Sequence, residues 1–573
     1  MADSARIKFE VQLFKGNKWH INDVVPTEES ARRKAEELLA LKTTEGVRIV
    51  KESHFGSDNR RETEIYKQMK EMEKEEDFSI TPVDETPLCE QVSDYYATDA
   101  RTTMARLFSK YLEKVEMTPL EMLHSHKSLK RVLNMDTMVP SAVDKIAALH
   151  ARATNTDSRK RKDIIYQAVD RIAARAREVD NKPLPELKGS TLDELWTQID
   201  GKFKDEEERK YMANVALARA SSNWTGWLGK MSELLPMAKN LKDDRARTMV
   251  DEMMADILIA KTVVKDVIGV SKHMGDAIMR MLDLVEGKCQ PTKFAAEELV
   301  GLLNFLFPAD LLPRAKKILF DRIERDLRGP TRLTNSEEPS ADKDFFVLLL
   351  NRVITDQGVT GGRSMAVGLT ERWARLINLG GASGRKKAME EVRDKLTSTT
   401  RKFVYLLSMY DPTGDAMLTD AITGQLKTFV AQLDTIQKIA PEAKTQKARL
   451  QEATQVQRLV LDSQLDDGLK AALAKKFDDV VSDYLITNKV IERIDDKALP
   501  FRDRAKRLVM FCTGGVLTEG KAKTIARDSV VGYLRRKDFI SEYTADIAEP
   551  AEKEAAIREF YALLAKTGFD VRG

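Results

Sequence analysis

The stretch DSRKRKDIIYQAVDRIAARAREV, residues 157–179, shows the pattern that most clearly indicates the fold class. Its apolar residues recur every three to four positions, as they do on one face of an α-helix. The apolar stripe consists of Ile164, Ile165, Ala168, Val169, Ile172, Ala176 and Val179. Asp157 or Ser158 can cap the start of this helix. The same spacing dominates the chain after residue 90, so we predict a predominantly all-α protein whose body is a multi-helix bundle.

The composition of the chain agrees with this prediction. Of the 573 residues, 28 are Gly and 17 are Pro, and average usage of these two residues is higher, roughly 12% of a chain. A loop-rich all-β fold is therefore disfavoured. Hydrophobic residues make up 42% and charged residues 32%, which allows a packed core. At about 100–200 residues per domain, we expect two to four domains.

Charge and hydropathy exclude several classes of protein. The net charge is only +3 at pH 7, so no overall field favours nucleic acid or a membrane surface as partner. The first residues contain no apolar segment typical of a signal peptide. The longest dense apolar run is 345–350, whereas a membrane span needs about 20 residues. We therefore expect a cytoplasmic protein without a membrane span.

The first 53 residues follow a different pattern from the rest. Residues 7–13 alternate between apolar and polar side chains, which indicates a half-buried strand. A turn signal and a second strand over 19–25 follow, then a helix from Pro26 and a third strand over 46–50. We therefore predict a small N-terminal ββαβ module, of the α+β class, over residues 1–53.

Composition shifts divide the remaining chain. Residues 54–90 are rich in charge, with Ile65 and Met69 four positions apart, and we predict a charged connector that contains a short helix. A polar, non-periodic stretch over 330–342 holds two prolines and is predicted to be a linker. We therefore expect one helical domain over 91–329 and another over 343–573.

No catalytic, cofactor or metal site is predicted. Cys89, Cys289 and Cys512 lie far apart in the sequence, so they indicate neither a disulfide framework nor a thiolate metal site. Residues 515–522, GVLTEGKA, match the phosphate-binding pattern G-x-x-x-x-G-K. However, Ala522 stands where Ser or Thr would hold magnesium, and no parallel sheet surrounds the motif. We interpret it as a helix–loop–helix connection whose glycines adopt special backbone angles.

Two short basic runs are candidate contacts for an anion or a nucleic acid. One precedes the helical stripe described above, and the other follows the glycines at 380–384 and could begin a helix. The runs consist of Arg159, Lys160, Arg161 and Lys162, and of Arg385, Lys386 and Lys387. Because the whole chain is close to neutral, nucleic acid is the less favoured partner.

Four aromatic and imidazole side chains are candidate contacts for a protein partner. They are Trp19 and His20 in the N-terminal module, and Trp224 and Trp227 near a predicted helix boundary. The ordinary interpretation is that the three tryptophans pack in a core or an interface and that His20 lies on the surface. Aromatic residues are also enriched where proteins bind one another.

These observations lead to three hypotheses for the function. The first is a non-enzymatic helical scaffold or regulatory adaptor that acts through protein–protein interaction, with residues 1–53 docking the partner and the body setting geometry or a homo-oligomeric state. The second is a nucleic-acid or anion-binding protein that uses the basic runs. The third is an enzyme whose helical active site has no recognisable motif.

Overall fold

The structure is a computed structural model that describes residues 6–15, 18–40, 46–55, 59–69, 78–187, 191–291 and 297–569. The chain divides into two units. One unit consists of Met1–Pro82 and Val132–Ile146, and the other of Val83–Arg131 and Ala147–Gly573. We call the strands and the helix within residues 6–69 the head, and the second unit the helical body.

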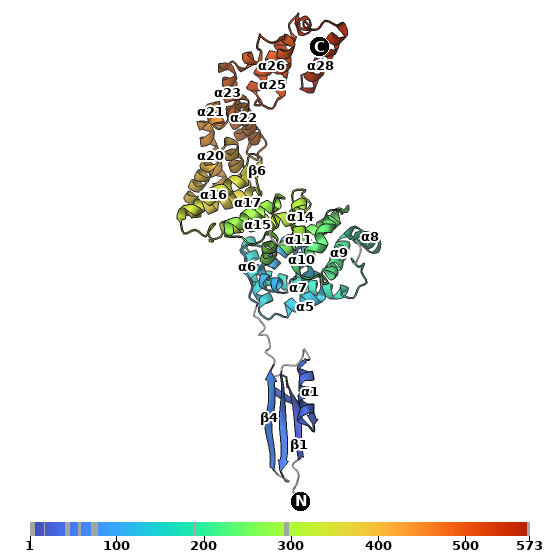
Figure 1. Ribbon diagram of the computed structural model, residues 1–573. Coiled ribbons are helices and arrows are strands. Elements are labelled where there is room, and N and C mark those ends of the chain that lie inside the picture. Colours follow the sequence, from blue (N-terminus) through green and yellow to red (C-terminus); the bar gives the residue numbers. More distant parts are fainter. Residues whose placement is uncertain are drawn as a thin grey trace. The chain divides into compact units, whose positions relative to one another are not determined.

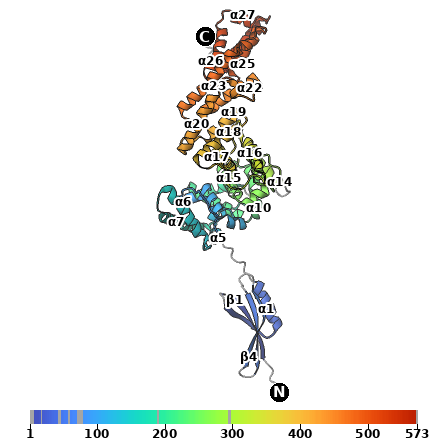
Figure 2. The same cartoon turned by 90° about the vertical axis from the view of Figure 1, so that its left-hand side faces the viewer.

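The head is a four-stranded antiparallel sheet with one helix packed on it (Figures 1 and 2). Its elements are β1 (Arg6–Lys15), β2 (Lys18–Val25), α1 (Glu28–Ala40), β3 (Gly46–Phe55) and β4 (Asn59–Met69). The strand order is β2-β1-β3-β4, so β2 and β4 are the edges of the described sheet.

Alternation along β1 places its apolar side chains on the face that α1 covers. Val11 is buried against Ile49 of β3 and against Ala31 and Ala35 of α1. Small alanines on the inner side of α1 let the helix approach the sheet closely. The predicted mostly α-helical protein with a small N-terminal α+β module is confirmed.

The predicted short helix in the connector is wrong for the described part of that segment. Residues 59–69 form β4, which pairs with β3 along its whole length. Ile65 and Tyr66 both pack against the head core, and a register shift between Ile49 and Val50 accommodates them. Pairing with a neighbouring strand has therefore overridden a charged pattern that was compatible with a helix. Residues 70–77 lie outside the described residues.

The chain after the head is almost entirely helical. The elements up to residue 306 are η1 (Val92–Tyr96), α2 (Thr98–Leu107), α3 (Ser109–Lys114), α4 (Pro119–His124), α5 (His126–Leu133), α6 (Met138–Thr154), α7 (Ser158–Val179), α8 (Leu192–Lys202), α9 (Glu206–Ser221), α10 (Gly226–Ala238), α11 (Asp244–Leu258), α12 (Lys261–Ile268), α13 (Met274–Val285) and α14 (Glu297–Leu306).

A second run of elements follows. They are α15 (Pro313–Arg328), α16 (Pro339–Val353), β5 (Ile354–Thr355), β6 (Gly358–Val359), α17 (Gly362–Leu376), α18 (Gly381–Lys395), α19 (Thr399–Met409), α20 (Ala416–Gln432), α21 (Ile436–Ile439), α22 (Gln446–Leu461), α23 (Asp467–Thr487), α24 (Val490–Ile494), α25 (Phe501–Thr513), α26 (Lys521–Leu534), α27 (Phe539–Tyr543) and α28 (Pro550–Lys566).

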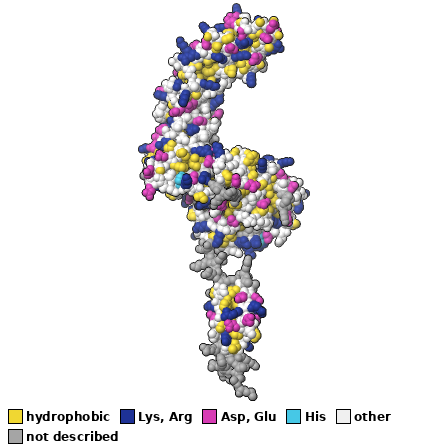
Figure 3. Space-filling model, viewed as in Figure 1, with side chains coloured by type: hydrophobic (Ala, Val, Ile, Leu, Met, Phe, Trp, Pro, Cys, Tyr) yellow, Lys and Arg dark blue, Asp and Glu magenta, His cyan; other side chains and the backbone are white. Residues whose placement is uncertain are grey.

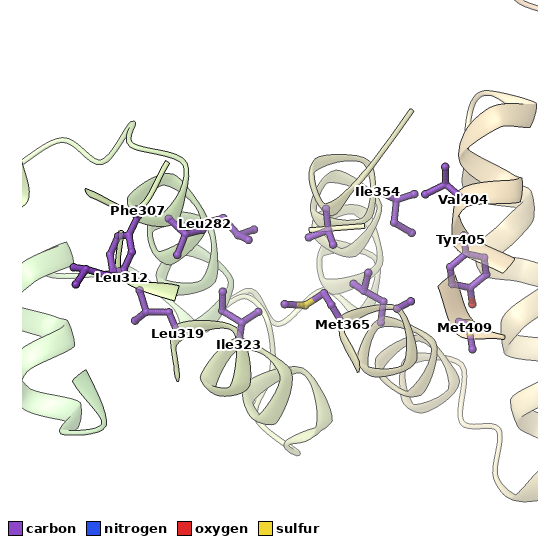
Figure 4. Packing of buried hydrophobic residues seen from close by; sticks show 14 of the residues in the cluster. Leu282, Phe307, Leu312, Leu319, Ile323, Ile354, Met365, Val404, Tyr405 and Met409 are labelled. Carbon is purple, nitrogen blue, oxygen red and sulfur yellow. The ribbon is translucent and has the colours of Figure 1, made fainter. Parts of the chain in front are cut away.

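The later helices of the body form a stack in which each helix packs mainly on helices near it in the sequence. The succession runs through α11, α15, α17, α19, α22, α23 and α26 (Figure 1). One apolar core continues along it. Figure 4 shows Leu319 of α15, Met365 of α17 and Tyr405 of α19 among the buried side chains of this core. Stacks of this kind are stabilised by contacts between neighbouring helices.

The stretch 330–342, predicted as a linker, is packed against the body. Leu333 is fully buried, and its carbonyl accepts the N–H of Gly275 at 2.8 Å. The buried carboxylate of Asp342 accepts the N–H of Thr334 at 2.8 Å and a guanidinium N–H of Arg332 at 3.1 Å. The division of the body into two domains at this point stays a prediction. In the structure, the connecting segment itself is packed against the body.

Buried carboxylates of α11 hold the first turns of other helices. The Asp251 carboxylate accepts the N–H groups of Arg314 and Ala315 at the start of α15, at 3.0 and 2.9 Å. The Asp256 carboxylate accepts the N–H of Leu120 at the start of α4, at 3.0 Å. The first N–H groups of a helix lack partners within the helix, and the helix dipole favours negative charge there. These carboxylates therefore fix which helix end meets α11.

Candidate functional site

The basic run at the start of α7 does not act as one patch. The Asp157 carboxylate caps the helix by accepting the N–H of Arg159 at 2.9 Å. Arg159 and Lys160 are exposed, whereas Arg161 is buried and faces the Glu90 carboxylate at 3.7 Å. Lys162 is half-buried. The structure thus leaves the first two cations of the run on the surface.

The second basic run is exposed as a whole. Arg385, Lys386 and Lys387 lie on α18, which begins at Gly381. The cations therefore come one turn after the helix start, and the glycines that precede them belong largely to the helix. The run is a surface stripe on a helix and lacks the glycine loop that was predicted to hold an anion.

The glycine loop before α26 is a helix–loop–helix connection, as predicted. It joins α25 to α26, and Gly515 and Gly520 both have positive φ, at 64° and 129°. The carboxylate of Asp478 occupies the N-terminus of α26, where it accepts the N–H groups of Lys521 and Ala522 at 2.6 and 3.0 Å. A side-chain carboxylate therefore lies where a phosphate lies in nucleotide-binding loops.

Trp19 and His20 lie on the edge strand β2. Trp19 is half-buried, with its ring 5.0 Å from that of Phe14, and the guanidinium of Arg48 lies 4.7 Å from the ring centre. His20 is exposed. Trp19 therefore belongs to the face of the sheet opposite α1, because Phe14 and Trp19 are paired across β1 and β2.

Trp224 and Trp227 belong to the core of the body. Trp227 is buried near the start of α10, and the Lys230 ammonium lies 5.2 Å from its ring centre. Trp224 is half-buried and packs against the same core. The packing interpretation therefore describes both residues.

A charge network that the sequence analysis missed lies inside the body. Arg101 of α2 is fully buried, and its guanidinium donates to both carboxylate oxygens of Asp256 at 3.1–3.2 Å and to Glu252 at 3.1 Å. Burial raises the pKa of Asp256 to about 6, against the lowering effect of Arg101. Burial also opposes the charge of Arg101, but Asp256 and Glu252 outweigh it and raise the pKa of Arg101.

A second buried ion pair lies on α4 and α10. The Lys230 ammonium donates to the Glu121 carboxylate at 2.6 Å. Glu121 also accepts from the Thr118 hydroxyl at 2.9 Å and from the Ser221 hydroxyl at 2.8 Å. With these donors around it, the Glu121 carboxylate ties α4 to α9 and α10. Buried charges are tolerated when they are paired and hydrogen-bonded in this way.

A small pocket beside Asp256 limits what this region can bind. Its lining includes Asp256, Trp227 and Glu113, and its volume is about 10 Å³. That volume is close to the minimum for one water molecule. The buried charges are therefore suited to holding helices in register, with no room here for an organic substrate.

A sequence signal for the network exists in hindsight. In α11 the acids Asp251, Glu252 and Asp256 alternate with apolar residues on all sides of the helix. A helix that is apolar all round is buried, so acids within it must be buried as well. Periodicity alone does not find the partner of these acids, because Arg101 lies about 150 residues earlier in the chain.

His124 is a fully buried titratable group with a strongly lowered pKa. Its ring lies 5.1 Å from the ring of Tyr96 and 5.0 Å from that of Tyr211, and its Nδ1–H donates to the carbonyl of Leu120 at 2.8 Å. Burial lowers the pKa of His124 to about 3. The imidazole is therefore neutral in the folded protein throughout the physiological pH range.

We expect His124→Phe to improve stability in mild acid. In the wild type, the unfolded imidazole gains its proton below about pH 6.5 while the folded one stays neutral down to about pH 3. Stability is therefore lost as pH falls through this window, by about 2 kcal/mol at pH 5. Phenylalanine keeps the ring contacts and does not titrate. We expect urea unfolding to show that, between pH 7.5 and pH 5, the free energy of unfolding of the wild type falls by about 2 kcal/mol more than that of the variant. An equal fall in both proteins would contradict the assignment.

Among the residues that the structure describes, neither a metal centre nor a membrane-spanning helix is found. Across the described ranges, no three His, Cys, Asp or Glu side chains are placed to hold a metal ion. Within the same ranges, no helix is both long enough and apolar enough to cross a membrane. No protein-family model, no curated protein and no solved structure matches this chain.

Proposed function

We propose that the protein is a non-enzymatic helical scaffold or regulatory adaptor, located in the cytoplasm, whose head docks a protein partner. The observation that carries the proposal is an apolar stripe on the edge strand β2, formed by Trp19, Ile21 and Val24. Support for the location comes from Cys89, Cys289 and Cys512, which are free thiols, as is usual in a reducing compartment.

A β-bulge creates the stripe. Ile21 pairs with Gln12 and Val24 pairs with Glu10, while the register shifts between these two pairs. Gln12 and Glu10 lie on the same face of β1 and hydrogen-bond to each other at 2.7 Å. The bulge therefore turns Val24 to the face that already carries Trp19 and Ile21. Bulges that re-aim a side chain are typical of functional edges.

The stripe lies on the face of the sheet opposite α1. The exposed fraction is 58% for Ile21 and 47% for Val24. Asp23 lies on the other face, where it pairs with Lys34 of α1 at 3.0 Å, and its carboxylate also accepts the N–H of Val24. Exposed apolar residues on an edge strand are typical of surfaces that bind an extended segment of a partner protein.

The helical body supports the scaffold part of the proposal. Buried ion pairs and carboxylate caps tie α2, α4, α11 and α15 together, and successive helices continue the stack to α26. A stack of this kind presents an extended surface, which is what a scaffold requires.

The test compares the proteins captured by the full-length wild type with those captured by two full-length variants. Ile21→Glu with Val24→Glu places two charges on the stripe, and we expect it to deplete the specifically captured proteins at least tenfold, as judged by quantitative mass spectrometry. Val270→Glu with Ile540→Glu in the body is the matched control, because these residues are 82% and 53% exposed and also receive two charges. Equal capture by the wild type and the stripe variant would contradict docking through the head.

A further inference from the structure

We propose that the surface formed by α5 and α7 of the helical body binds single-stranded nucleic acid. We define this α5–α7 surface by seven exposed cations and one exposed aromatic ring. They are Lys127, Lys130, Arg131, Arg159, Lys160, Arg171, Arg177 and Tyr166. Figures 1 and 2 both show α5 beside α7, and Lys and Arg side chains gather over these helices in Figure 3.

The cations of α5 share one side of a short helix. Lys127, Lys130 and Arg131 are three to four positions apart and exposed, while Leu129 between them is buried. Residues at this spacing are neighbours on a helix surface. The helix carries no acid, so its outer side is purely cationic.

The exposed cations of α7 lie outside its core stripe. Ile165, Ala168 and Ile172 are buried, whereas Arg171 and Arg177 are exposed. With 22 residues, α7 is about 33 Å long, so its exposed cations are spread along its length. A line of separated charges fits the repeated phosphates of a nucleic-acid strand better than a single small anion.

These cations are free to bind a ligand. Within the ranges that the structure describes, none of the seven has an ion pair, in contrast with Arg161, which faces Glu90, and Arg175, which pairs with Glu208 at 2.8 Å. The exposed acids among them on α7 are Asp163 and Asp170, while Glu178 pairs with Lys182. Cations thus outnumber free acids on this surface although the chain as a whole is nearly neutral.

The exposed ring favours a single strand over a duplex. Tyr166 is 38% exposed and lies seven residues after Arg159, so both are on the same side of α7. An aromatic ring beside cations offers a platform on which an unpaired base can stack. In a duplex the faces of the bases are covered by their neighbours, and the ring would have no such partner.

The test is binding of a labelled mixed-sequence oligonucleotide of about 20 nucleotides to the full-length protein, measured by fluorescence anisotropy over a salt series. We expect log K to fall with log salt with a slope of about −3 to −5, because each phosphate contact on a single strand contributes about −0.7. Lys127→Glu, Lys130→Glu and Arg131→Glu combined should weaken binding at least tenfold at low salt and make the slope shallower by about 2.

Two further variants separate the proposal from its alternatives. Tyr166→Ala should weaken binding about tenfold through lost stacking. Arg385→Glu, Lys386→Glu and Lys387→Glu combined change the charge equally on an exposed helix elsewhere and should leave binding unchanged. Circular dichroism verifies that all variants are folded.

Several results would overturn the proposal. They are no salt-sensitive binding at low ionic strength, equal weakening by the two triple variants, or tighter binding of the wild type to polyglutamate or to vesicles of anionic lipid than to the oligonucleotide. An unchanged affinity in the α5 triple variant would equally rule out this surface. None of these outcomes bears on the head, so the proposed scaffold function is tested separately.

Discussion

Arg101→Met is expected to lower the free energy of unfolding by about 3–5 kcal/mol, because it removes the cation from a buried network and leaves the buried Asp256 carboxylate without its cationic partner. The carboxylates of Asp256 and Glu252 both accept hydrogen bonds from the Arg101 guanidinium, and all three side chains are shielded from water. Methionine fills a similar volume without the charge. Urea denaturation at pH 7.5 measures the loss.

A matched variant separates burial from pairing. Arg245 also has two carboxylate partners, Asp200 at 2.8 Å and Asp243 at 2.7 Å, but its side chain is 38% exposed. Because exposed pairs contribute little, we expect Arg245→Met to cost about 1 kcal/mol or less. Adding Asp256→Leu to Arg101→Met should recover part of the loss, since it removes the carboxylate that the arginine variant leaves without a cation. Equal costs for the two arginine variants would contradict the role of burial.

Asp478→Ala is expected to cost about 2–4 kcal/mol of unfolding free energy. The Asp478 carboxylate accepts the Thr518 hydroxyl at 2.8 Å and two N–H groups at the start of α26. Its removal leaves the buried Thr518 hydroxyl and the buried N–H of Ala522 without this partner, and each such group costs about 1–3 kcal/mol. Gly520 is adapted to this carboxylate, because a Cβ at that position would collide with it.

The neighbouring residue provides the control for Asp478. The side chain of Asp479 is 44% exposed and pairs with Lys475 one turn earlier at 2.8 Å. An exposed pair of this spacing is worth about 0.3–0.5 kcal/mol, so Asp479→Ala should leave the thermal unfolding midpoint nearly unchanged. If Asp478→Ala were as mild as Asp479→Ala, the carboxylate would not be what holds α26 in place.

The fold was predictable where one local pattern determines one element. The apolar stripe after Asp157 predicts a helix that the structure places at Ser158–Val179, with Asp157 as its cap. The alternation over residues 7–13 predicts β1. Both patterns concern residues a few positions apart, and hydrophobic burial on one face decides them.

The remaining features depend on partners that are distant in the sequence. β4 is a strand because β3 offers it hydrogen bonds, and its charged composition gave no sign of that. Arg161 was grouped with exposed cations, yet the fold buries it beside Glu90. Arg101 meets Asp256 only after α2 and α11 pack together. Local spacing does not determine long-range pairs of this kind.

The two proposed surfaces assign different partners to different parts of the chain. The head offers an apolar stripe on β2, which suits a protein segment, and the body offers the cations of α5 and α7, which suit phosphates. An adaptor that joins a protein to a nucleic acid would combine both. The two surfaces lie in separate units, so each can be altered without changing the other.

The most direct test of docking through the head is amide hydrogen exchange of the full-length protein, alone and in a purified complex with a captured partner. The account predicts slower exchange in β2, over Lys18–Val25, because its edge and its apolar stripe become covered. Exchange in α11, which is buried in the body, should stay the same. Protection confined to the helical body, with unchanged exchange in β2, would contradict the proposal.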